Sequence, residues 1–268
     1  MGTKANRYAQ IVEHIFAQGY SPGIEEIQFE RGDIERAAIE LGMPIPKNVG
    51  DVLYSFRHRY PLPESILQTQ PAGKEWVING AGRSKYVFRL VTFSRIEPNQ
   101  HLITTKVPDA TPEIVSRYAL GDEQALLAKV RYNRLVDVFL GLTTYSLQNH
   151  LRTTVSDVGQ IEIDEIYIGI DSAGRHFVVP VQAKGGSDQL GIVQTEQDLA
   201  YCAERYPELI CRAVSAQFMR EDKIAMFELV LEGDTLRVAR ERHYALVPSS
   251  DITDEDLRRY SSFGDDGY

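Results

Sequence analysis

Two apolar, β-type segments separated by a short turn constrain the fold of this chain more than any other feature. Residues 161–170 and 177–183 are rich in Ile, Val and Phe, and Asp171-Ser172-Ala173-Gly174 between them is a typical turn sequence. In the second segment the odd positions are apolar, whereas Gln182 and Lys184 share the even face, because side chains alternate across a strand. The pattern predicts a β-hairpin with one face in a core and an amide beside an ammonium group on the other.

The first of these segments carries three acidic residues. Apolar residues occupy its odd positions as far as residue 163 and its even positions after Asp164-Glu165, which predicts a bulge or bend at this acidic pair. Glu162 and Asp164 share one face before the bend. A hairpin with nearly equal arms puts Asp164 opposite Lys184, so that a carboxylate, an amide oxygen and an ammonium group converge. The alternative interpretation is a buried ion pair between neighbouring strands.

Phosphodiester hydrolysis requires such a set of groups. Mg²⁺ prefers hard oxygen ligands, and it neutralises charge in the transition state and activates a water molecule. A lysine orients or deprotonates the nucleophile and stabilises the developing charge. We therefore expect Asp164, the Gln182 amide oxygen and the Ala183 backbone carbonyl to bind metal, with Lys184 as the catalytic cation.

These residues resemble the PD-(D/E)xK nuclease superfamily, in the Q-x-K variant typical of Mrr-type restriction enzymes. The resemblance is carried by Gly159-Gln160-Ile161-Glu162-Ile163-Asp164-Glu165, followed by Gln182-Ala183-Lys184-Gly185. It implies an α-β-β-β-α-β core across residues 122–218, restriction of foreign DNA, and Mg²⁺ as cofactor with Mn²⁺ able to substitute. By position Asp164 matches the metal-binding acid, Gln182 the second position of the signature and Lys184 the lysine, while Glu162 and Glu165 compete for the metal.

Helical segments on either side of the hairpin hold further candidates. Residues 197–201 resemble the Q-x-x-x-Y motif of the recombination-type exonuclease branch, and Gln197 and Tyr201 are expected to face the site with Gln194. His150 is a candidate phosphate contact, with local hydrogen bonding at a helix end as the alternative. Glu123 and Asp137 are weaker candidates for a further acidic ligand.

The N-terminal third has the order of elements of a winged helix. Apolar periodicity predicts helices over residues 8–18, 33–41 and 48–60, the second capped by Asp33, and a β-hairpin follows over 76–91. The expected phosphate contacts lie at the end of the third helix and in the hairpin turn: Arg57, Arg59, Arg83 and Lys85. The alternative is an exposed basic helix end and loop on a packing domain.

The distribution of charge supports a division into modules. The formal net charge of −9 argues by itself against a polyanion-binding protein. Residues 47–106, however, contain 9 basic and 4 acidic residues, whereas residues 121–268 contain 15 basic and 25 acidic ones. A locally basic module joined to an acidic one is compatible with nucleic-acid binding.

We therefore predict a mixed α/β (α+β) chain with four parts. They are a winged-helix-like DNA-recognition domain over 1–95, a linker over 96–121, a nuclease domain with a mixed sheet flanked by helices over 122–250, and a poorly ordered acidic tail over 251–268. The nuclease domain is expected to open with one long helix over 122–151, broken near Gly141.

No apolar stretch is long enough to span a membrane or to act as a signal peptide, so a soluble, cytoplasmic protein without a membrane partner is expected. The predicted function is a Mg²⁺-dependent endonuclease acting on double-stranded DNA, of type II or Mrr-like restriction type. It should act as a homodimer, because cutting two strands ordinarily needs two sites. The alternatives are a structure-specific or exonucleolytic enzyme of the same fold, which Tyr201 favours, and a non-catalytic winged-helix DNA-binding regulator.

Overall fold

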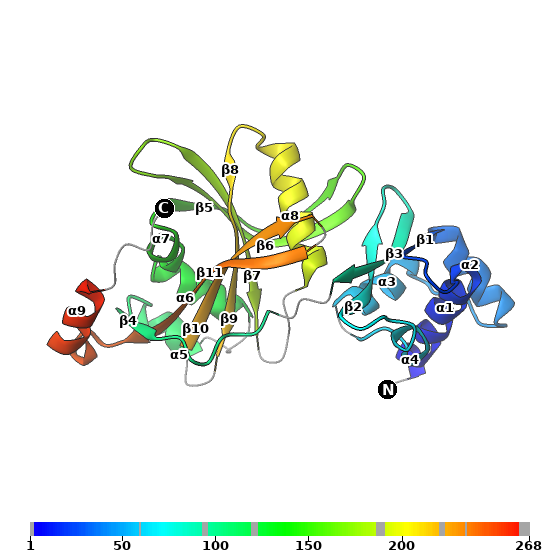
Figure 1. Ribbon diagram of the computed structural model, residues 1–268, viewed down its shortest axis with the longest axis horizontal. Helices are drawn as coiled ribbons and strands as arrows, with labels where there is room; N and C mark the ends of the chain where they lie inside the picture. The colour runs from blue at the N-terminus through cyan, green and yellow to red at the C-terminus, as the bar shows by residue number, and fades with distance from the viewer. Residues whose placement is uncertain are drawn as a thin grey trace. The chain divides into compact units, whose positions relative to one another are not determined.

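A mixed sheet of eight strands and a separate antiparallel sheet of three strands organise this mixed α/β chain (Figure 1). The computed structural model describes residues 3–58, 60–92, 96–118, 123–185, 191–219, 223–233 and 235–262. Two units are distinguished: the first comprises residues 1–94, 153–161 and 233–235, and the second comprises the remainder. No helix in the described ranges is both long enough and apolar enough to cross a membrane.

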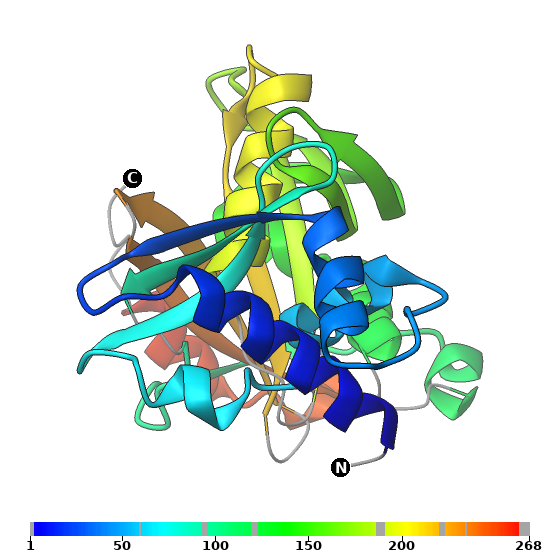
Figure 2. The ribbon, with the colours of Figure 1, turned by 90° about the vertical axis from the view of Figure 1, so that its right-hand side faces the viewer.

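The first unit contains the small sheet, with strand order β1-β3-β2 and antiparallel pairing throughout. One helix precedes β1, three helices follow it before the hairpin, and α1 runs along the sheet (Figure 2). The elements are α1 (Thr3–Gly19), β1 (Glu26–Glu30), α2 (Arg31–Glu40), α3 (Val49–His58), α4 (Glu64–Leu67), β2 (Lys74–Gly80) and β3 (Lys85–Thr92).

An apolar core confirms the predicted helices and hairpin of this unit. Phe16 of α1 packs edge-on against Trp76 and Phe88, with ring centroids 5.1 and 5.2 Å apart, respectively. Two details differ from the sequence analysis. Glu30, and not Asp33, is the N-cap of α2, because Asp33 occupies the third helical position of a capping box and accepts a hydrogen bond from the Glu30 N–H. Strand β1 was not predicted, although its alternating burial is that of a half-buried strand.

The second unit contains the large sheet, with strand order β4-β11-β10-β9-β7-β6-β5 and β8 paired to β7. Its strands are β4 (Thr104–Pro108), β5 (Thr143–Val155), β6 (Gly159–Ile170), β7 (His176–Lys184), β8 (Ile210–Cys211), β9 (Ala213–Phe218), β10 (Lys223–Glu232) and β11 (Thr235–Val247). Its helices are α5 (Glu113–Tyr118), α6 (Glu123–Tyr132), α7 (Leu135–Leu140), α8 (Ile192–Arg205) and α9 (Asp254–Ser261), with a 3-10 turn at Ser249–Asp251.

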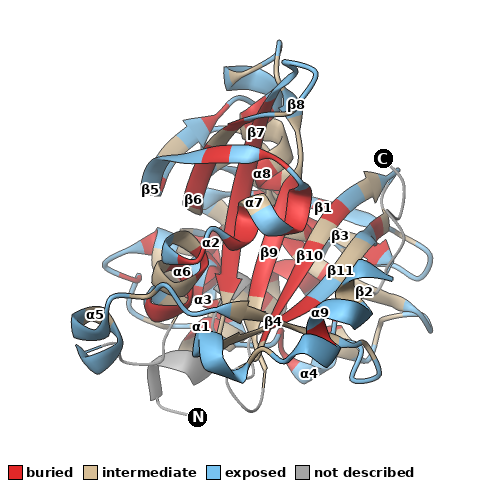
Figure 3. Ribbon diagram, turned by 90° about the vertical axis from the view of Figure 1, so that its left-hand side faces the viewer, coloured by how far each residue is buried: buried red, intermediate tan, exposed pale blue. Residues whose placement is uncertain are grey.

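Strand β7 lies inside the sheet and is covered on both faces (Figure 3). It pairs antiparallel with β6 and parallel with β9, and α8 forms the connection to the parallel strand. Its odd positions 177, 179, 181 and 183 join the core formed with α6 and α7. On the other face Gln182 contacts α8 through Asp198. The predicted hairpin, its two-faced pattern and the following helix are thus confirmed.

The predicted long helix over 122–151 is wrong in its second half. Helix α6 ends near Asn133, whose side chain donates to the Lys129 carbonyl at 2.9 Å, and Arg134 adopts a left-handed φ of 50°. Helix α7 ends at Gly141, which has a φ of 67°. The chain then forms β5, because Thr143 and Thr144 favour strand over helix.

The predicted linker over 96–121 also needs correction. Residues 104–108 form β4, which pairs in parallel with β11, and residues 113–118 form α5. Part of this stretch therefore belongs to the large sheet. The Pro and Thr content that indicated a linker is compatible with an edge strand, where backbone groups on one side need no partner.

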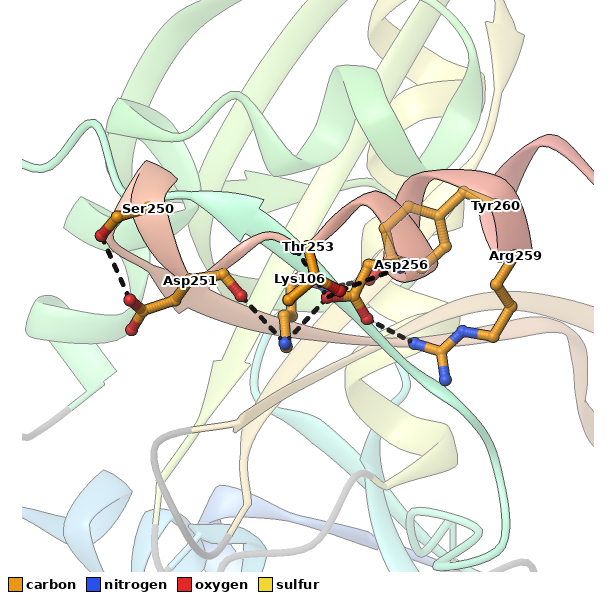
Figure 4. Close-up of polar contacts among 7 residues, drawn as sticks. All are labelled: Lys106, Ser250, Asp251, Thr253, Asp256, Arg259 and Tyr260. Atoms are coloured by element: carbon orange, nitrogen blue, oxygen red, sulfur yellow. Dashed lines mark hydrogen bonds and ion pairs between the residues drawn. The ribbon is translucent and has the colours of Figure 1, made fainter.

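The predicted disordered tail is in part a docked helix (Figure 4). Helix α9 begins with a capping box between Thr253 and Asp256, and Asp256 accepts from Lys106 of β4 at 2.9 Å and from Arg259 at 3.1 Å. The Tyr260 hydroxyl accepts the backbone N–H of Lys106 at 2.9 Å. The remainder of the predicted tail, residues 263–268, lies outside the described ranges.

Asp256→Ala should release α9 from β4 without unfolding the second unit. The Lys106 ammonium and the Thr253 hydrogen bonds hold the pKa of Asp256 well below its usual range, so the docking is complete at neutral pH. The stabilisation by Asp256 should be lost as the pH falls from about 4, the ordinary pKa of Asp, towards the lower pKa of the docked carboxyl. Limited trypsin digestion should cut at Arg258 about tenfold faster in the variant. Glu255→Ala, an exposed neighbour, is the control, and equal rates in both variants would contradict the docking.

Candidate functional site

The proposed acid and the signature strand meet where regular pairing of β6 and β7 ends. The last paired residues are Glu165 and Val181, and beyond them the Asp164 Oδ2 atom accepts the backbone N–H of Ala183 at 2.9 Å. The expected register placed Asp164 opposite Lys184. The observed pairing of Glu165 with Val181 is shifted by two residues along β7, so that continuing the register places residue 164 level with 182. The convergence of Asp164 with the Gln182-Ala183-Lys184 run is nevertheless present.

Lys184 lies on the same face of β7 as Gln182, and only 11% of its side chain is exposed. Its Nζ atom lies 3.9 Å from Oε1 of Glu123, the first residue of α6. Of the two weaker acidic candidates, Glu123 therefore borders the site. Asp137 instead caps Thr144 on β5, accepting its backbone N–H at 2.9 Å.

Burial dominates the electrostatics of Asp164. It raises the pKa of this carboxyl above its usual value, and the charge of Glu162 raises it further. The Ala183 hydrogen bond and the charges of Lys184 and His150 act in the opposite direction. His150, the candidate phosphate contact, is thus close enough to influence Asp164, and it lies on strand β5 with a φ of 48° instead of at a helix end.

Gln182 is held by a residue that the sequence analysis did not assign. Its Nε2 atom donates to both carboxylate oxygens of Asp198 on α8, each at 3.0 Å. Asp198 is 2% exposed, and burial raises its pKa well above the usual range. A signal was present in the sequence, because Asp198 interrupts the helical stripe formed by Ile192, Thr195 and Cys202, all of which are buried.

The three neighbouring acids of β6 have different surroundings. Glu162 shares the Asp164 face and pairs with Arg152 of β5 at 3.2 Å. Glu165 is fully buried on the opposite face, where it accepts from Arg131 at 2.8 Å and from Ser146 at 2.6 Å. The expected change of apolar phase is wrong, because odd positions remain buried from 161 to 169. Glu165 therefore does not share a ligand set with Asp164.

The Q-x-x-x-Y residues do not enter the site in the expected way. Gln197 is buried, and among the described residues neither it nor Tyr201 bonds to Asp164, Gln182 or Lys184. Tyr201 packs edge-on against Tyr206 with ring centroids 6.0 Å apart, and burial together with this neighbour raises its pKa to about 12. Asp198 is the residue of this helix that reaches β7.

The expected DNA-contact residues lie in the first unit. Arg83 and Lys85 are exposed around the turn between β2 and β3. Arg57 is within α3, but its side chain lies outside the described part of the structure, as does all of Arg59.

The oxygen donors near Asp164 are suitable for Mg²⁺. No group of three or more His, Cys, Asp or Glu side chains in the described ranges is arranged to bind a metal. The Asp164 carboxylate, the Gln182 amide oxygen and the Ala183 carbonyl are nevertheless hard ligands, and Mg²⁺ usually combines one or two carboxylates with water and substrate oxygens. The Ala183 N–H points to Asp164, and the carbonyl of a strand residue faces the same edge as its N–H.

A separate pocket of about 260 Å³ lies on the Glu165 face of the sheet. It is lined by α6, α7, β5 and Tyr167 of β6, and within the described ranges Glu165 Oε2 and the Tyr167 hydroxyl have no hydrogen-bond partner. Burial, and next the Glu165 charge, raise the pKa of Tyr167, which keeps its hydroxyl neutral. Because Glu165 is fully buried, its carboxylate depends on the ion pair with Arg131 for compensation of its charge.

Comparison with known proteins gives no family assignment. No protein-family model matches the chain, and no curated protein matches it. The function of the site is therefore inferred from its residues and contacts.

Arg131→Met should destabilise the protein by removing the cation that compensates Glu165. We expect a loss of about 2 kcal/mol, below the 3–5 kcal/mol typical of fully buried pairs, because Arg131 is 37% exposed. Urea denaturation followed by circular dichroism measures this loss. Arg237→Met, which breaks an exposed pair with Glu232, should change stability by less than about 1 kcal/mol. Equal effects of the two substitutions would show that Glu165 does not depend on Arg131.

Proposed function

We propose that this protein is a Mg²⁺-dependent DNA endonuclease of restriction type, with a catalytic unit similar to the PD-(D/E)xK superfamily. The observation that carries the proposal is the meeting of Asp164, in the middle of β6, with Gln182 and Lys184 at the end of β7, joined by the bond from Ala183 to Asp164. A carboxylate, an amide and a nearly enclosed lysine in this arrangement are the groups that phosphodiester hydrolysis needs.

The order of elements is compatible with this proposal. The sequence α6-α7, β5, β6, β7, α8, β9 follows the α-β-β-β-α-β core that the resemblance implies. Strands β5, β6, β7 and β9 are consecutive neighbours in the sheet, and the acid and the lysine lie on the two middle strands of these four. This topology brings residues 18 or more positions apart in sequence into one group.

Each residue of the group has a chemical task in the proposed reaction. Asp164, Gln182 and the Ala183 carbonyl would hold the metal, which when bound supplies positive charge to the phosphate and lowers the pKa of a water molecule. Lys184 would hold the attacking water by hydrogen bonding and stabilise negative charge on the phosphoryl oxygens. The low exposure of Lys184 strengthens these electrostatic interactions, because little water screens them.

The first unit is proposed to be a winged-helix DNA-binding module. Support comes from its order of elements, from the strand order β1-β3-β2 and from exposed Arg83 and Lys85 around the hairpin turn. In such modules a helix enters the major groove while the hairpin contacts the backbone. The proposed assembly is a homodimer on double-stranded DNA, because each chain contributes one candidate site.

Lys184→Met and Asp164→Asn should each lower plasmid cleavage by about 100-fold or more, because each removes a charge that stabilises the transition state. Supercoiled plasmid, methylated and unmethylated, is incubated with Mg²⁺, and nicked and linear products are quantified. Arg237→Met should cleave like wild type. Full activity of the Lys184 variant would contradict the catalytic assignment, whereas degradation that needs a DNA end would indicate an exonuclease. Intact plasmid together with no Mg²⁺ or Mn²⁺ binding by calorimetry would indicate a regulator.

Replacement of Arg83 and Lys85 by Ala should weaken binding to a 25-base-pair duplex similarly for all sequences. Each lost phosphate contact should reduce the slope of log K against log salt by about 1. Fluorescence anisotropy at several salt concentrations, without divalent metal, measures both quantities. Lys74→Ala at the opposite end of the same hairpin is the matched control. An unchanged salt slope in the double variant would exclude the hairpin turn from the DNA contact.

A further inference from the structure

The amide of Gln182 has its nitrogen enclosed by acceptors. Both oxygens of Asp198 lie 3.0 Å from Nε2, and the backbone carbonyl of Glu162 lies 3.5 Å from it. Gln182 is 4% exposed and Asp198 is 2% exposed, so water does not compete for these bonds. The nitrogen end of the amide is therefore fixed towards α8.

This fixes the position of the other end of the amide. A backbone carbonyl only accepts hydrogen bonds, so a reversed amide would place Oε1 against the Glu162 carbonyl and remove the donor from the Asp198 oxygens. Oε1 must then point away from Asp198. Ala183 and Lys184 follow Gln182 on β7, and Asp164 lies level with it on β6. The end of the amide that faces away from α8 is therefore an oxygen, on the strand position between Val181 and Ala183.

We propose that Asp198 is a positioning residue that holds the Gln182 amide so that its oxygen faces the metal. This inference rests on the proposed function. A carboxylate at position 182 would bind a metal directly, whereas here an amide takes that place and the carboxyl group lies behind it on α8. The hydrogen bonds from Nε2 to Asp198 polarise the amide and make Oε1 a better ligand than the oxygen of an isolated glutamine.

The pair offers a reciprocal exchange of side chains as a test. Asp198→Asn keeps the shape but allows the Gln182 amide to turn, and it should weaken Mn²⁺ binding about 10-fold or more, as loss of a supporting hydrogen bond does at metal sites. Gln182→Glu places two carboxylates against each other in a buried space and should lower stability. The double variant restores an amide–carboxylate pair with the roles exchanged. It should regain stability and bind Mn²⁺ at least as tightly as wild type.

Urea denaturation in EDTA and calorimetry with Mn²⁺ are performed on wild type, both single variants and the double variant, with plasmid cleavage as a third measurement. Glu208→Gln, an exposed acid beyond α8, is the control for loss of one charge and should match wild type. Recovery of both stability and Mn²⁺ affinity in the double variant supports the inference.

Two results would overturn it. One is wild-type Mn²⁺ affinity in folded Asp198→Asn, and the other is a double variant no more stable and no tighter in Mn²⁺ binding than Gln182→Glu. Either result leaves the nuclease proposal intact if wild type binds Mn²⁺ and cleaves DNA. A wild-type chain that does neither contradicts the proposed function and, with it, the metal role of Asp198.

Discussion

Strand β7 must bury both of its faces, and its even face ends in a glutamine and a lysine. Strands β6 and β9 cover its two edges, and residues 177–183 are buried on both faces. Apolar side chains satisfy the odd face, but Gln182 and Lys184 require polar partners. Asp198 provides them for the amide, and Glu123 is the acid 3.9 Å from the ammonium. The packing of α8 and the start of α6 against the sheet is thus tied to the polar residues of one strand.

Two neighbouring acids of β6, the half-buried Asp164 and the buried Glu165, show how different partners lead to different chemistry. Glu165 has a guanidinium and a hydroxyl as partners, and removing it from them is costly. Asp164 has a backbone N–H on Oδ2, and within the described ranges no hydrogen bond engages Oδ1. Its raised pKa reflects this incomplete compensation. Asp164, which has no ion pair within the described ranges, is suited to a ligand, whereas Glu165, whose Oε1 atom bonds to Arg131 and Ser146, stabilises the fold.

Local periodicity predicted helices α1, α3 and α8, strands β6 and β7, and the face that Gln182 and Lys184 share. It failed where structure depends on neighbours. Strand β5 is at the edge of the sheet and most of its side chains are exposed, so it lacks the alternation that identifies a strand. The hairpin register depends on a turn in which Asp171 bonds to Arg175, which composition does not specify. The contact of Asp198 with Gln182 could not be predicted from periodicity, because it depends on the packing of α8 against β7.

The charges around the site give a physical reason for a divalent cation. Asp164, Glu162, Asp198 and Glu123 form an acidic group, and Lys184 and Arg152 are the cations that pair with two of its members. Burial raises the pKa values of Asp164 and Asp198, and ionisation of both would leave the group with two more negative than positive charges and would repel an approaching phosphate. One divalent cation held at Asp164 offsets this excess and provides an attractive centre for the phosphate oxygens. The negative balance of the chain is thus compatible with a nucleic-acid substrate when acids of the site hold a metal and the exposed Arg83 and Lys85 of the first unit contact phosphates.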